Sequence, residues 1–398
     1  MINLKKIILI IPILLLFCGC NDYKELNNIA IVSGMSIDIK DDKYEVNILV
    51  ANSKTTEESE KEGTAGNAVY NGKGISISDA LKKIDNILPK QLYLGHLGVV
   101  VISEDVAKRG IDDITDYFFR NPETTKRFYL IMTRDNQKAG DVLKILSPLE
   151  SFPFQNIRLN IENSSSTGSL SDNLTYSEFI EMYLKKGINP YIPTIKIYGN
   201  VKKGSSTKAL ESTNIKSYVG TKGLALFTDT KFVGYASEDE SRGINVVIGN
   251  ASDMLIKNKY YDGYINTAIS NLKTTKKVKF KNNKPIFYVN VKASGDIVEV
   301  DSKMNLYDEQ NLKELQYKIE KRIKELCLKG IDKAKDIESD VFGFGNMVYK
   351  KNPKYFKSIK DWNKYFKDVD IKVYVSVEIK NKGAIKQSIK GAKYESME

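Results

Sequence analysis

The chain has 398 residues, of which 41% are hydrophobic and 28% are charged, and its formal net charge at pH 7 is +11. These values describe an ordinary soluble globular protein of two or three domains. The single histidine and the three cysteines exclude a histidine-rich metal site within one chain and a framework of disulfides.

The first twenty residues have the pattern of a secretion signal. Lys5 and Lys6 precede an unbroken apolar run at 7–17, and Cys18, Gly19 and Cys20 follow before polar residues return. The apolar run is too short to be a good permanent anchor, because a spanning helix needs about 20 apolar residues. No second run approaches that length. We therefore expect residues 1–19 to be removed as a signal peptide.

The end of this signal resembles a bacterial lipobox, in which a signal peptidase cuts before a cysteine linked to diacylglycerol. Gly19 supplies the small residue required before the cut, and Cys20 supplies the sulfur that a thioether requires. We expect Cys20 to carry diacylglycerol and an N-acyl chain such as palmitate, which together suffice for stable anchoring outside the cytoplasm. The alternatives are an uncleaved signal anchor and a secreted protein with an incidental cysteine. Cys327 then has no partner within the chain, and its helical pattern predicts a small buried residue.

The positive charge comes almost entirely from lysines spread along the chain beside abundant isoleucine and asparagine. This composition is typical of an AT-rich genome, so it does not predict a nucleic-acid partner. Lysines are densest at 272–294, which holds seven and no acid, and at 349–398, which holds thirteen against six acids. Such zones are solvated faces, or they add roughly 1 kcal/mol per lysine to binding at an anionic bilayer.

The first half alternates between strand and helix patterns. A hairpin is expected where Asp41 and Asp42 separate two β-type segments, and Ser78 is the expected N-cap of the first helix. The expected elements are the hairpin 26–40 and 44–51, a loop at 53–66, helix 78–88, strand 92–102, helix 103–119, strand 126–133, helix 139–146, a loop at 160–173, helix 176–185 and strand 191–198.

The second half is dominated by long β-type segments and one long amphipathic helix. A second hairpin is expected at Asn282 and Asn283, and the helix at 308–337 should cover a sheet. The expected elements are strands 215–227 and 231–235, a helix or turn-rich crossover at 237–248, strands 264–281 and 285–300, helix 308–337, a Gly-aromatic turn at 342–345, helix 353–366 with Trp362, and strand 369–379.

This order predicts an α+β protein with several domains, in which mixed sheets are covered by helices behind the cleaved signal peptide. The stretch 200–213 is rich in lysine, glycine and serine and is the expected linker. It separates an N-terminal mixed α/β domain at 20–199 from a C-terminal α+β domain at 214–398, which forms one domain or two subdomains.

No pattern in the chain predicts catalysis. The only histidine, His96, lies in an apolar strand between glycines and is expected to be a core or edge residue. Residues 342–345 lack the spacing of a phosphate loop. The paired acids Asp112 with Asp113 and Asp368 with Asp370 are typical of solvated helix and strand ends. We therefore expect no enzyme, and no catalytic, metal-binding or cofactor-binding residues.

Several segments resemble, in their order, the Ger(x)C family, the lipoprotein C subunit of spore germinant receptors. The resemblance covers nearly the whole chain behind the lipobox. The matching stretches are Cys20-Asn21-Asp22, Gly34 with Ile37-Asp38, Gly95-His96-Leu97, Gly110-Ile111, Arg120-Asn121-Pro122-Glu123, Phe232-Val233-Gly234-Tyr235 with Glu240 and Gly243, and Asp340-Val341-Phe342-Gly343-Phe344-Gly345 followed by Pro353, Trp362 and Phe366.

The resemblance implies a non-enzymatic subunit needed for spore germination, held by Cys20 on the outer face of the inner spore membrane. It also implies assembly with two integral membrane subunits of the same germinant receptor. The alternative is a solute-binding lipoprotein that delivers a small ligand to a transporter, which should show two similar lobes and a ligand cleft. An exported hydrolase is a third hypothesis, which the single histidine disfavours.

Overall fold

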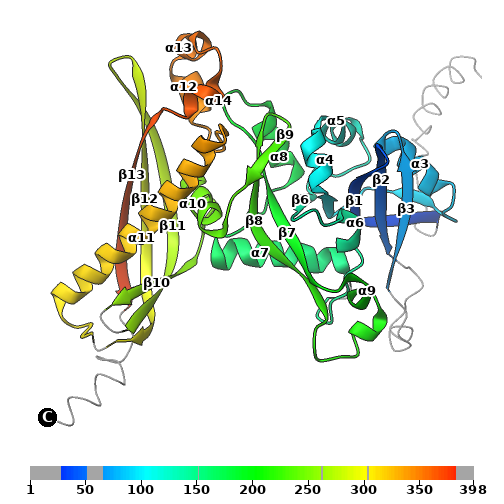
Figure 1. The fold of residues 1–398 in the computed structure, drawn as a ribbon, viewed down its shortest axis with the longest axis horizontal. Coiled ribbons are helices and arrows are strands. Elements are labelled where there is room, and N and C mark those ends of the chain that lie inside the picture. Colours follow the sequence, from blue (N-terminus) through cyan, green and yellow to red (C-terminus); the bar gives the residue numbers. More distant parts are fainter. Residues whose placement is uncertain (1–27, 52–65, 151, 261–262, 303, 382–398) are drawn as a thin grey trace, which may run out of the picture.

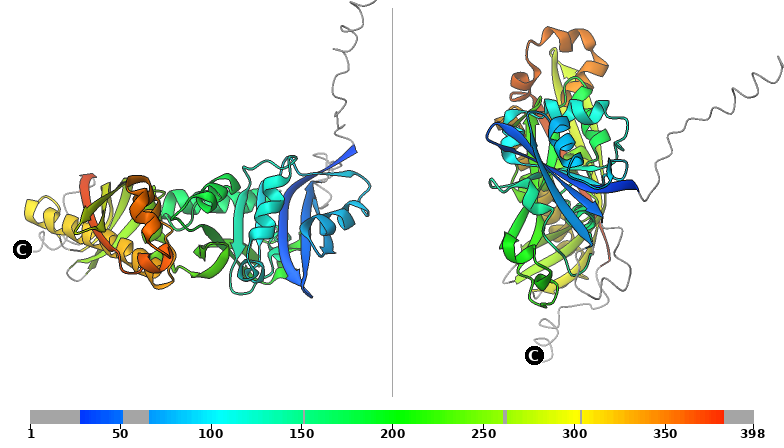
Figure 2. Two further views of the ribbon diagram at one scale, coloured as in Figure 1. Left: turned by 90° about the horizontal axis from the view of Figure 1, so that it is seen from above. Right: turned by 90° about the vertical axis from the view of Figure 1, so that its right-hand side faces the viewer.

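The computed structural model describes residues 28–51, 66–150, 152–260, 263–302 and 304–381. Within these residues the chain is elongated, with strands β1–β3 at one end of the long axis and a second sheet at the other (Figure 1 and Figure 2). The predicted signal peptide, Cys20 and nearly all of the loop expected at 53–66 lie outside the described residues.

The first sheet contains nine strands within the described residues, in the order β3-β2-β1-β5-β6-β7-β8-β9, with β4 paired to β1. In this order the neighbours from β1 to β7 pair in parallel, as do β1 and β4, and the other neighbouring pairs are antiparallel. The strands are β1 (Ile29–Lys40), β2 (Lys43–Ala51), β3 (Asn67–Gly74), β4 (Gln91–Tyr93), β5 (Val99–Ile102), β6 (Tyr129–Thr133), β7 (Tyr191–Gly199), β8 (Ser217–Thr228) and β9 (Lys231–Tyr235).

Helices cover both faces of this sheet, so its middle strands are buried on both sides. All four residues of β5 are fully buried, as expected for a central parallel strand. One face packs against α3 (Ile77–Asp85), α4 (Glu104–Arg109), α5 (Asp112–Arg120) and α8 (Tyr176–Leu184). The other face packs against α6 (Ala139–Val142) and α7 (Pro153–Gly168).

The second sheet has four strands in the described residues, in the order β10-β11-β12-β13. The strands are β10 (Met254–Tyr260), β11 (Gly263–Lys281), β12 (Lys284–Asp301) and β13 (Asp370–Asn381). One face packs against α10 (Glu238–Ile248) and the long helix α11 (Glu309–Asp336). Three short helices, α12 (Phe344–Lys351), α13 (Pro353–Ser358) and α14 (Trp362–Phe366), follow α11. We call the second sheet with its helices the second lobe, and the first sheet with its helices the first lobe.

The mixed α+β fold with two sheets and covering helices is confirmed, and so are both expected hairpins. Asp41 and Asp42 have φ values of 54° and 57°, and Asn282 and Asn283 have 50° and 58°. Two successive residues with positive φ are what a two-residue type I′ turn requires, and Asp and Asn tolerate that conformation. Cys327 is fully buried in α11, as its pattern predicts.

Several local predictions in the first half are wrong in detail. The N-cap of α3 is Ser76 and not Ser78, because the Ser76 side chain accepts the Asp79 N–H. The strand expected at 92–102 is divided into β4 and β5. The helix expected at 103–119 is divided into α4 and α5 at Gly110, whose φ of 114° cannot continue a helix.

The loop expected at 160–173 is mostly helix, which is the largest error in the first half. Helix α7 runs to Gly168, and its Ile157 and Ile161 are buried against the first sheet. Pro153 at the first helical position favours this start. In the second half, the helix expected at 353–366 is two short helices, α13 and α14.

The linker expected at 200–213 contains the short helices α9 (Val201–Gly204) and η2 (Thr207–Ala209), and it connects β7 to β8. These two strands pair antiparallel within the first sheet. The change from the first sheet to the second falls after β9, at α10. The division of the chain into domains stays a prediction.

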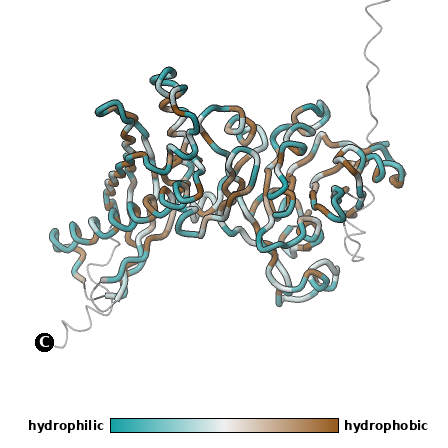
Figure 3. The backbone as a smooth tube through the Cα atoms, turned by 45° about the horizontal axis from the view of Figure 1, so that its top comes forward, coloured by the Kyte–Doolittle hydropathy of each residue, from teal (hydrophilic) through white to brown (hydrophobic). Residues whose placement is uncertain are grey.

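Hydrophobic stretches follow the strands of the first sheet, whereas the tip of the β11–β12 hairpin is hydrophilic (Figure 3). The core of the second lobe continues into the first sheet, because Tyr191 of β7 and Leu224 and Leu226 of β8 belong to the same buried cluster as α11. None of the helices in the described part of the chain is long and apolar enough to cross a membrane.

Candidate functional site at the junction of the two sheets

The predicted lipidation site, Cys20, lies outside the described residues, so it stays a prediction. The described residues do place the other singled-out side chains. His96 lies in the turn between β4 and β5 and is exposed, so of the two expected placements, core or edge, the core placement is wrong. Its ring stacks edge-on against Tyr93, at 5.7 Å between centroids. Among the described residues no group hydrogen-bonds to His96, so it lacks the orienting partner typical of a catalytic base.

The paired acids serve as separate structural contacts. Asp113 accepts a hydrogen bond from the Tyr44 hydroxyl at 2.7 Å, and Asp112 accepts one from Tyr183 at 3.3 Å. Burial and the neighbouring Asp113 raise the pKa of Tyr44 to about 12. Asp368 and Asp370 are exposed beside the start of β13. In the described part of the chain, no three His, Cys, Asp or Glu side chains gather as a metal site.

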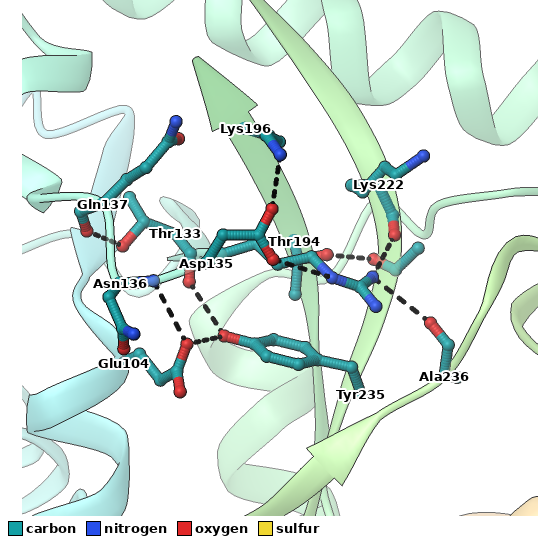
Figure 4. A network of polar contacts seen from close by, with 12 residues as sticks. Glu104, Thr133, Asp135, Asn136, Gln137, Thr194, Lys196, Lys222, Tyr235 and Ala236 are labelled. Atoms are coloured by element: carbon teal, nitrogen blue, oxygen red, sulfur yellow. Dashed lines mark hydrogen bonds and ion pairs between the residues drawn. The ribbon is translucent and has the colours of Figure 1, made fainter. Parts of the chain in front are cut away.

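A polar network joins the ends of β6 and β9 to the start of α4 (Figure 4). The Tyr235 hydroxyl donates to Glu104 Oε2 at 2.6 Å, and the Asn136 N–H points to the same oxygen at 3.4 Å. The Arg134 guanidinium lies 4.3 Å from the centre of the Tyr235 ring, a cation–π contact. Lys108 contacts the other oxygen of Glu104 at 2.6 Å.

Arg134 extends this network to the strands that lead into the second lobe. Its Nη1 donates to the carbonyl oxygens of Lys222 at 2.6 Å and Ala236 at 3.3 Å. The next residue, Asp135, forms an ion pair with Lys196 of β7. The side chain of Arg134 is only 15% exposed, so these contacts hold a charge that is mostly shielded from water. The network therefore fixes β6, β7, β8 and β9 relative to one another.

The electrostatics of this network favour a charged Glu104 and a neutral Tyr235. Burial alone raises the pKa of Glu104, but Lys108, Tyr235 and the Asn136 N–H together hold it below its ordinary value. Burial and the Glu104 carboxylate raise the pKa of Tyr235 well above its ordinary value. A tyrosine held neutral in this way is a hydrogen-bond donor and not a base.

A second group of contacts surrounds Asp340, at the turn between α11 and α12. Its carboxylate accepts the N–H groups of Gly345 at 2.7 Å and of Phe342 and Phe344 at 3.2 Å. It also accepts the indole Nε1 of Trp362 at 2.8 Å. Burial raises the pKa of this carboxyl, while the N–H donors of Gly345, Trp362 and Phe344, together with the nearby Lys276, oppose the rise.

The Asp340 turn also contacts the first lobe. The Asp340 carbonyl accepts the Asn189 N–H at 2.8 Å, and the Gly187 carbonyl accepts the Asn346 N–H at 2.9 Å. The Asn189 side chain accepts the Asp229 N–H at 3.1 Å and donates to Asn363 at 2.7 Å. The 342–345 turn is thus a packing and hydrogen-bonding element, as predicted, and it binds the α8–β7 loop.

Helices α10 and α11 cross at a point that only glycines allow. A methyl group at Gly243 would lie 1.8 Å from the Leu326 carbonyl oxygen, and one at Gly330 would lie 2.7 Å from the Ile244 nitrogen. Asp239 of α10 pairs with Arg322 at 3.1 Å and with Lys329 at 2.6 Å beside this crossing. Glu240 closes a capping box with Ser237 at the start of α10. Helix capping by Glu240 and close packing at Gly243 therefore explain these two residues of the stretch that resembles the family.

These contacts form one junction, which we define as Glu104, Arg134, Tyr235, Gly243 and Asp340 with their partners. Its side chains are hydrogen-bonded to each other or to backbone groups, which suits rigid positioning rather than reaction. The resemblance drew attention to Tyr235, Gly243 and Asp340, but Glu104 and Arg134 were missed. Their partners lie about a hundred residues away in sequence, and no local pattern indicates such pairs.

Comparisons with known proteins agree with this architecture. A family model described as the spore germination protein N-terminal domain matches residues 22–197. A second, described as the spore germination B3/GerAC-like C-terminal domain, matches residues 222–383. The crystal structure of the GerBC protein superposes with a TM-score of 0.56 at 20% identity, covering 90% of this chain and 100% of that one.

Relatives match over nearly their full length. Spore germination protein KC of Bacillus subtilis (strain 168) is 27% identical over 387 residues, covering 94% of each chain. Spore germination protein B3 of the same organism is 24% identical over 380 residues, covering 94% of this chain and 96% of the relative.

The fold is therefore that of the GerBC protein, a mixed α+β chain with two unlike sheets. With both family models matched in order, the chain belongs to the Ger(x)C family of spore germination proteins. This membership confirms the resemblance and supports a role in spore germination.

Proposed function

We propose that this protein is a lipid-anchored, non-enzymatic subunit of a nutrient germinant receptor, held on the outer face of the inner spore membrane. It docks there to two multi-pass membrane subunits of the same receptor. The observation that carries the proposal is the ordered match of both family models, which begins two residues after Cys20.

The proposed anchor is diacylglycerol with an N-acyl chain on Cys20. Cys20 precedes Ile29, the first residue of β1, by nine residues, so the tether spans at most about 30 Å when fully extended. The first sheet is therefore kept close to the bilayer, within reach of integral membrane partners. No other covalent group or cofactor is part of the proposal.

The arrangement of the described residues supports positioning rather than catalysis. Hydrogen bonds of the junction connect the two lobes, and His96 is exposed with the Tyr93 ring packed against it. A solute-binding lipoprotein should have two similar lobes. In the part of the chain that the structure describes, the first sheet has nine strands with helices on both faces, and the second sheet has four strands. A subunit that docks to membrane partners therefore fits this architecture better than a solute-binding lipoprotein does.

The test compares Cys20→Ala with the matched control Cys18→Ala in spores. Both variants lose one thiol from the same short stretch, but only Cys20 is expected to receive lipid. We expect Cys20→Ala to leave the inner-membrane fraction, to stop co-purifying with the multi-pass subunits, and to slow the nutrient response. Cys18→Ala should behave as the wild type. Unchanged co-purification and germination in Cys20→Ala would contradict the proposal.

A further inference from the structure

The second sheet has one face that no described element covers. Helices α10 and α11 pack on one side of it, where alternate residues such as Phe287, Val289 and Val373 are buried. On β11, β12 and β13 the residues between these buried positions point away from the helices. Figure 1 shows these three strands side by side with α11 running along them. We call the uncovered side the outer face.

The strand register gathers lysines on this outer face. In one row across the three strands, Lys277 pairs with Tyr288 and Tyr288 pairs with Lys372. In a second row, Lys273 pairs with Lys292. Between these rows, Asn290 pairs with Tyr374. The lysines of the outer face and its hairpin tip are Lys273, Lys277, Lys279, Lys281, Lys284, Lys292, Lys372 and Lys380.

These lysines are not neutralised by the rest of the protein. All of them are exposed, and within the described residues none forms an ion pair. The outward positions of the three strands also carry five carboxylates: Asp370 and Glu378 on β13, and Asp296, Glu299 and Asp301 on β12. The three on β12 lie at the end of the sheet away from the β11–β12 hairpin tip. The part of the outer face nearer the β11–β12 hairpin, where the paired lysine rows lie, is therefore strongly positive. The hydrophilic tip of the β11–β12 hairpin belongs to it (Figure 3).

The chemistry of the outer face fits a diffuse anionic surface rather than one phosphate or carboxylate group. It contains lysines and no arginine, and lysine is a point charge without the fork that binds such groups in a bidentate manner. Tyr374, which is 52% exposed, and Tyr288 add amphipathic rings of the kind found at membrane interfaces. The lysines of a surface attracted to anionic lipid need no fixed partners.

We propose that the outer face of the second sheet binds the anionic headgroups of the membrane. The membrane setting rests on the proposed function, but the binding itself does not require the lipid on Cys20. The tether would then hold one end of the elongated chain and the outer face would hold the other. The molecule would then lie along the bilayer.

The test uses the chain from residue 21 onward, which retains every described element and lacks the lipid. Binding is measured by co-sedimentation with vesicles of phosphatidylcholine alone and of phosphatidylcholine with an equal amount of phosphatidylglycerol. The outer-face variant combines K273Q, K277Q, K292Q and K372Q. The control variant combines K313Q, K321Q, K324Q and K354Q, which removes the same charge from exposed sites on α11 and α13.

We expect the wild-type chain to bind the anionic vesicles, weakly at high salt, and not the neutral ones. The outer-face variant should lose roughly a hundredfold or more in affinity, and the control variant far less. Equal losses in both variants, or no preference for anionic vesicles, would overturn the proposal. The proposal would also be overturned if single-stranded nucleic acid or an acidic peptide released the protein from the vesicles at a concentration below that of the anionic lipid. Since this chain lacks Cys20, its failure would leave the anchoring experiment untouched.

Discussion

The carboxylate of Asp340 accepts a hydrogen bond from Nε1 of Trp362 at 2.8 Å, in the fully buried core of the second lobe. The same carboxylate accepts the Gly345 N–H, and the carbonyl of Asp340 accepts the Asn189 N–H from the first lobe. One residue thus orders the 342–345 turn, fixes the only tryptophan and contacts the neighbouring lobe. Asp340 is therefore a position of the junction at which a substitution should have a large effect.

Asp340→Asn should destabilise the protein strongly. The amide replaces one accepting oxygen with an NH₂ group, which faces N–H donors and leaves at least one of them buried without an acceptor. The expected loss in the free energy of unfolding is about 2–4 kcal/mol, measured by urea denaturation at pH 7.

Asp361→Asn is the matched control for this substitution. Asp361 is the N-cap of α14 and its side chain is 45% exposed. Asparagine caps helices about as well as aspartate, so the loss should stay below about 0.5 kcal/mol. Equal stability of the Asp340→Asn and Asp361→Asn variants would show that the buried carboxylate does not hold the turn.

Gly243→Ala should disrupt the α10–α11 crossing. The added methyl group would lie 1.8 Å from the Leu326 carbonyl oxygen, which cannot move without shifting the α11 backbone. We expect a loss of at least about 3 kcal/mol, or a chain that does not fold. Thermal denaturation followed by circular dichroism measures it.

Gly168→Ala provides the matched helical control. A methyl group there meets nothing within 4 Å, so the change should be neutral or stabilising by about 0.5–1 kcal/mol. Equal stability of the Gly243→Ala and Gly168→Ala variants would show that α10 and α11 do not approach each other this closely.

Tyr235→Phe should weaken the network at Glu104 in a pH-dependent way. Removing the hydroxyl loses a hydrogen bond to a charged group, worth about 1.5–3 kcal/mol at pH 7. The pKa of Glu104 lies below 4.5 in the folded protein, so the unfolded chain binds the proton first as the pH falls. Stability from this group is present above pH 4.5 and is lost below it.

The phenylalanine variant has a less depressed Glu104 pKa, so it should lose less stability between pH 6 and pH 3 than the wild type. The difference between the two proteins therefore narrows on acidification. Tyr198→Phe is the control, because its hydroxyl has no hydrogen-bond partner in the described part of the chain. A Tyr235→Phe difference that stays constant with pH would mean that Glu104 is not coupled to this hydroxyl.

The sequence predicts those parts of the fold that short segments determine. The turns at Asp41-Asp42 and Asn282-Asn283 are set by residues that tolerate positive φ. The long helix α11 follows from its apolar stripe. Helix α7 was missed because its serines and asparagines are weak helix formers, and its stability comes from Ile157 and Ile161 packed on the first sheet.

The junction could be predicted only in part, because its pairs are distant in sequence. Glu104 and Tyr235 are 131 residues apart, and Arg134 and Ala236 are 102 apart. Gly243 has an evident role only when α11 is placed against α10. The family resemblance indicated which residues to examine, and the structure supplied their partners.

The central claim is that lipid on Cys20 anchors this protein to the membrane beside the integral receptor subunits. Mass spectrometry of the N-terminal peptide of the mature protein, isolated from spore membranes, tests it most directly. The account predicts a chain that begins at Cys20 and carries the mass of diacylglycerol and an N-acyl chain. An unmodified Cys20, or a mature chain that retains residues 1–19, would contradict it.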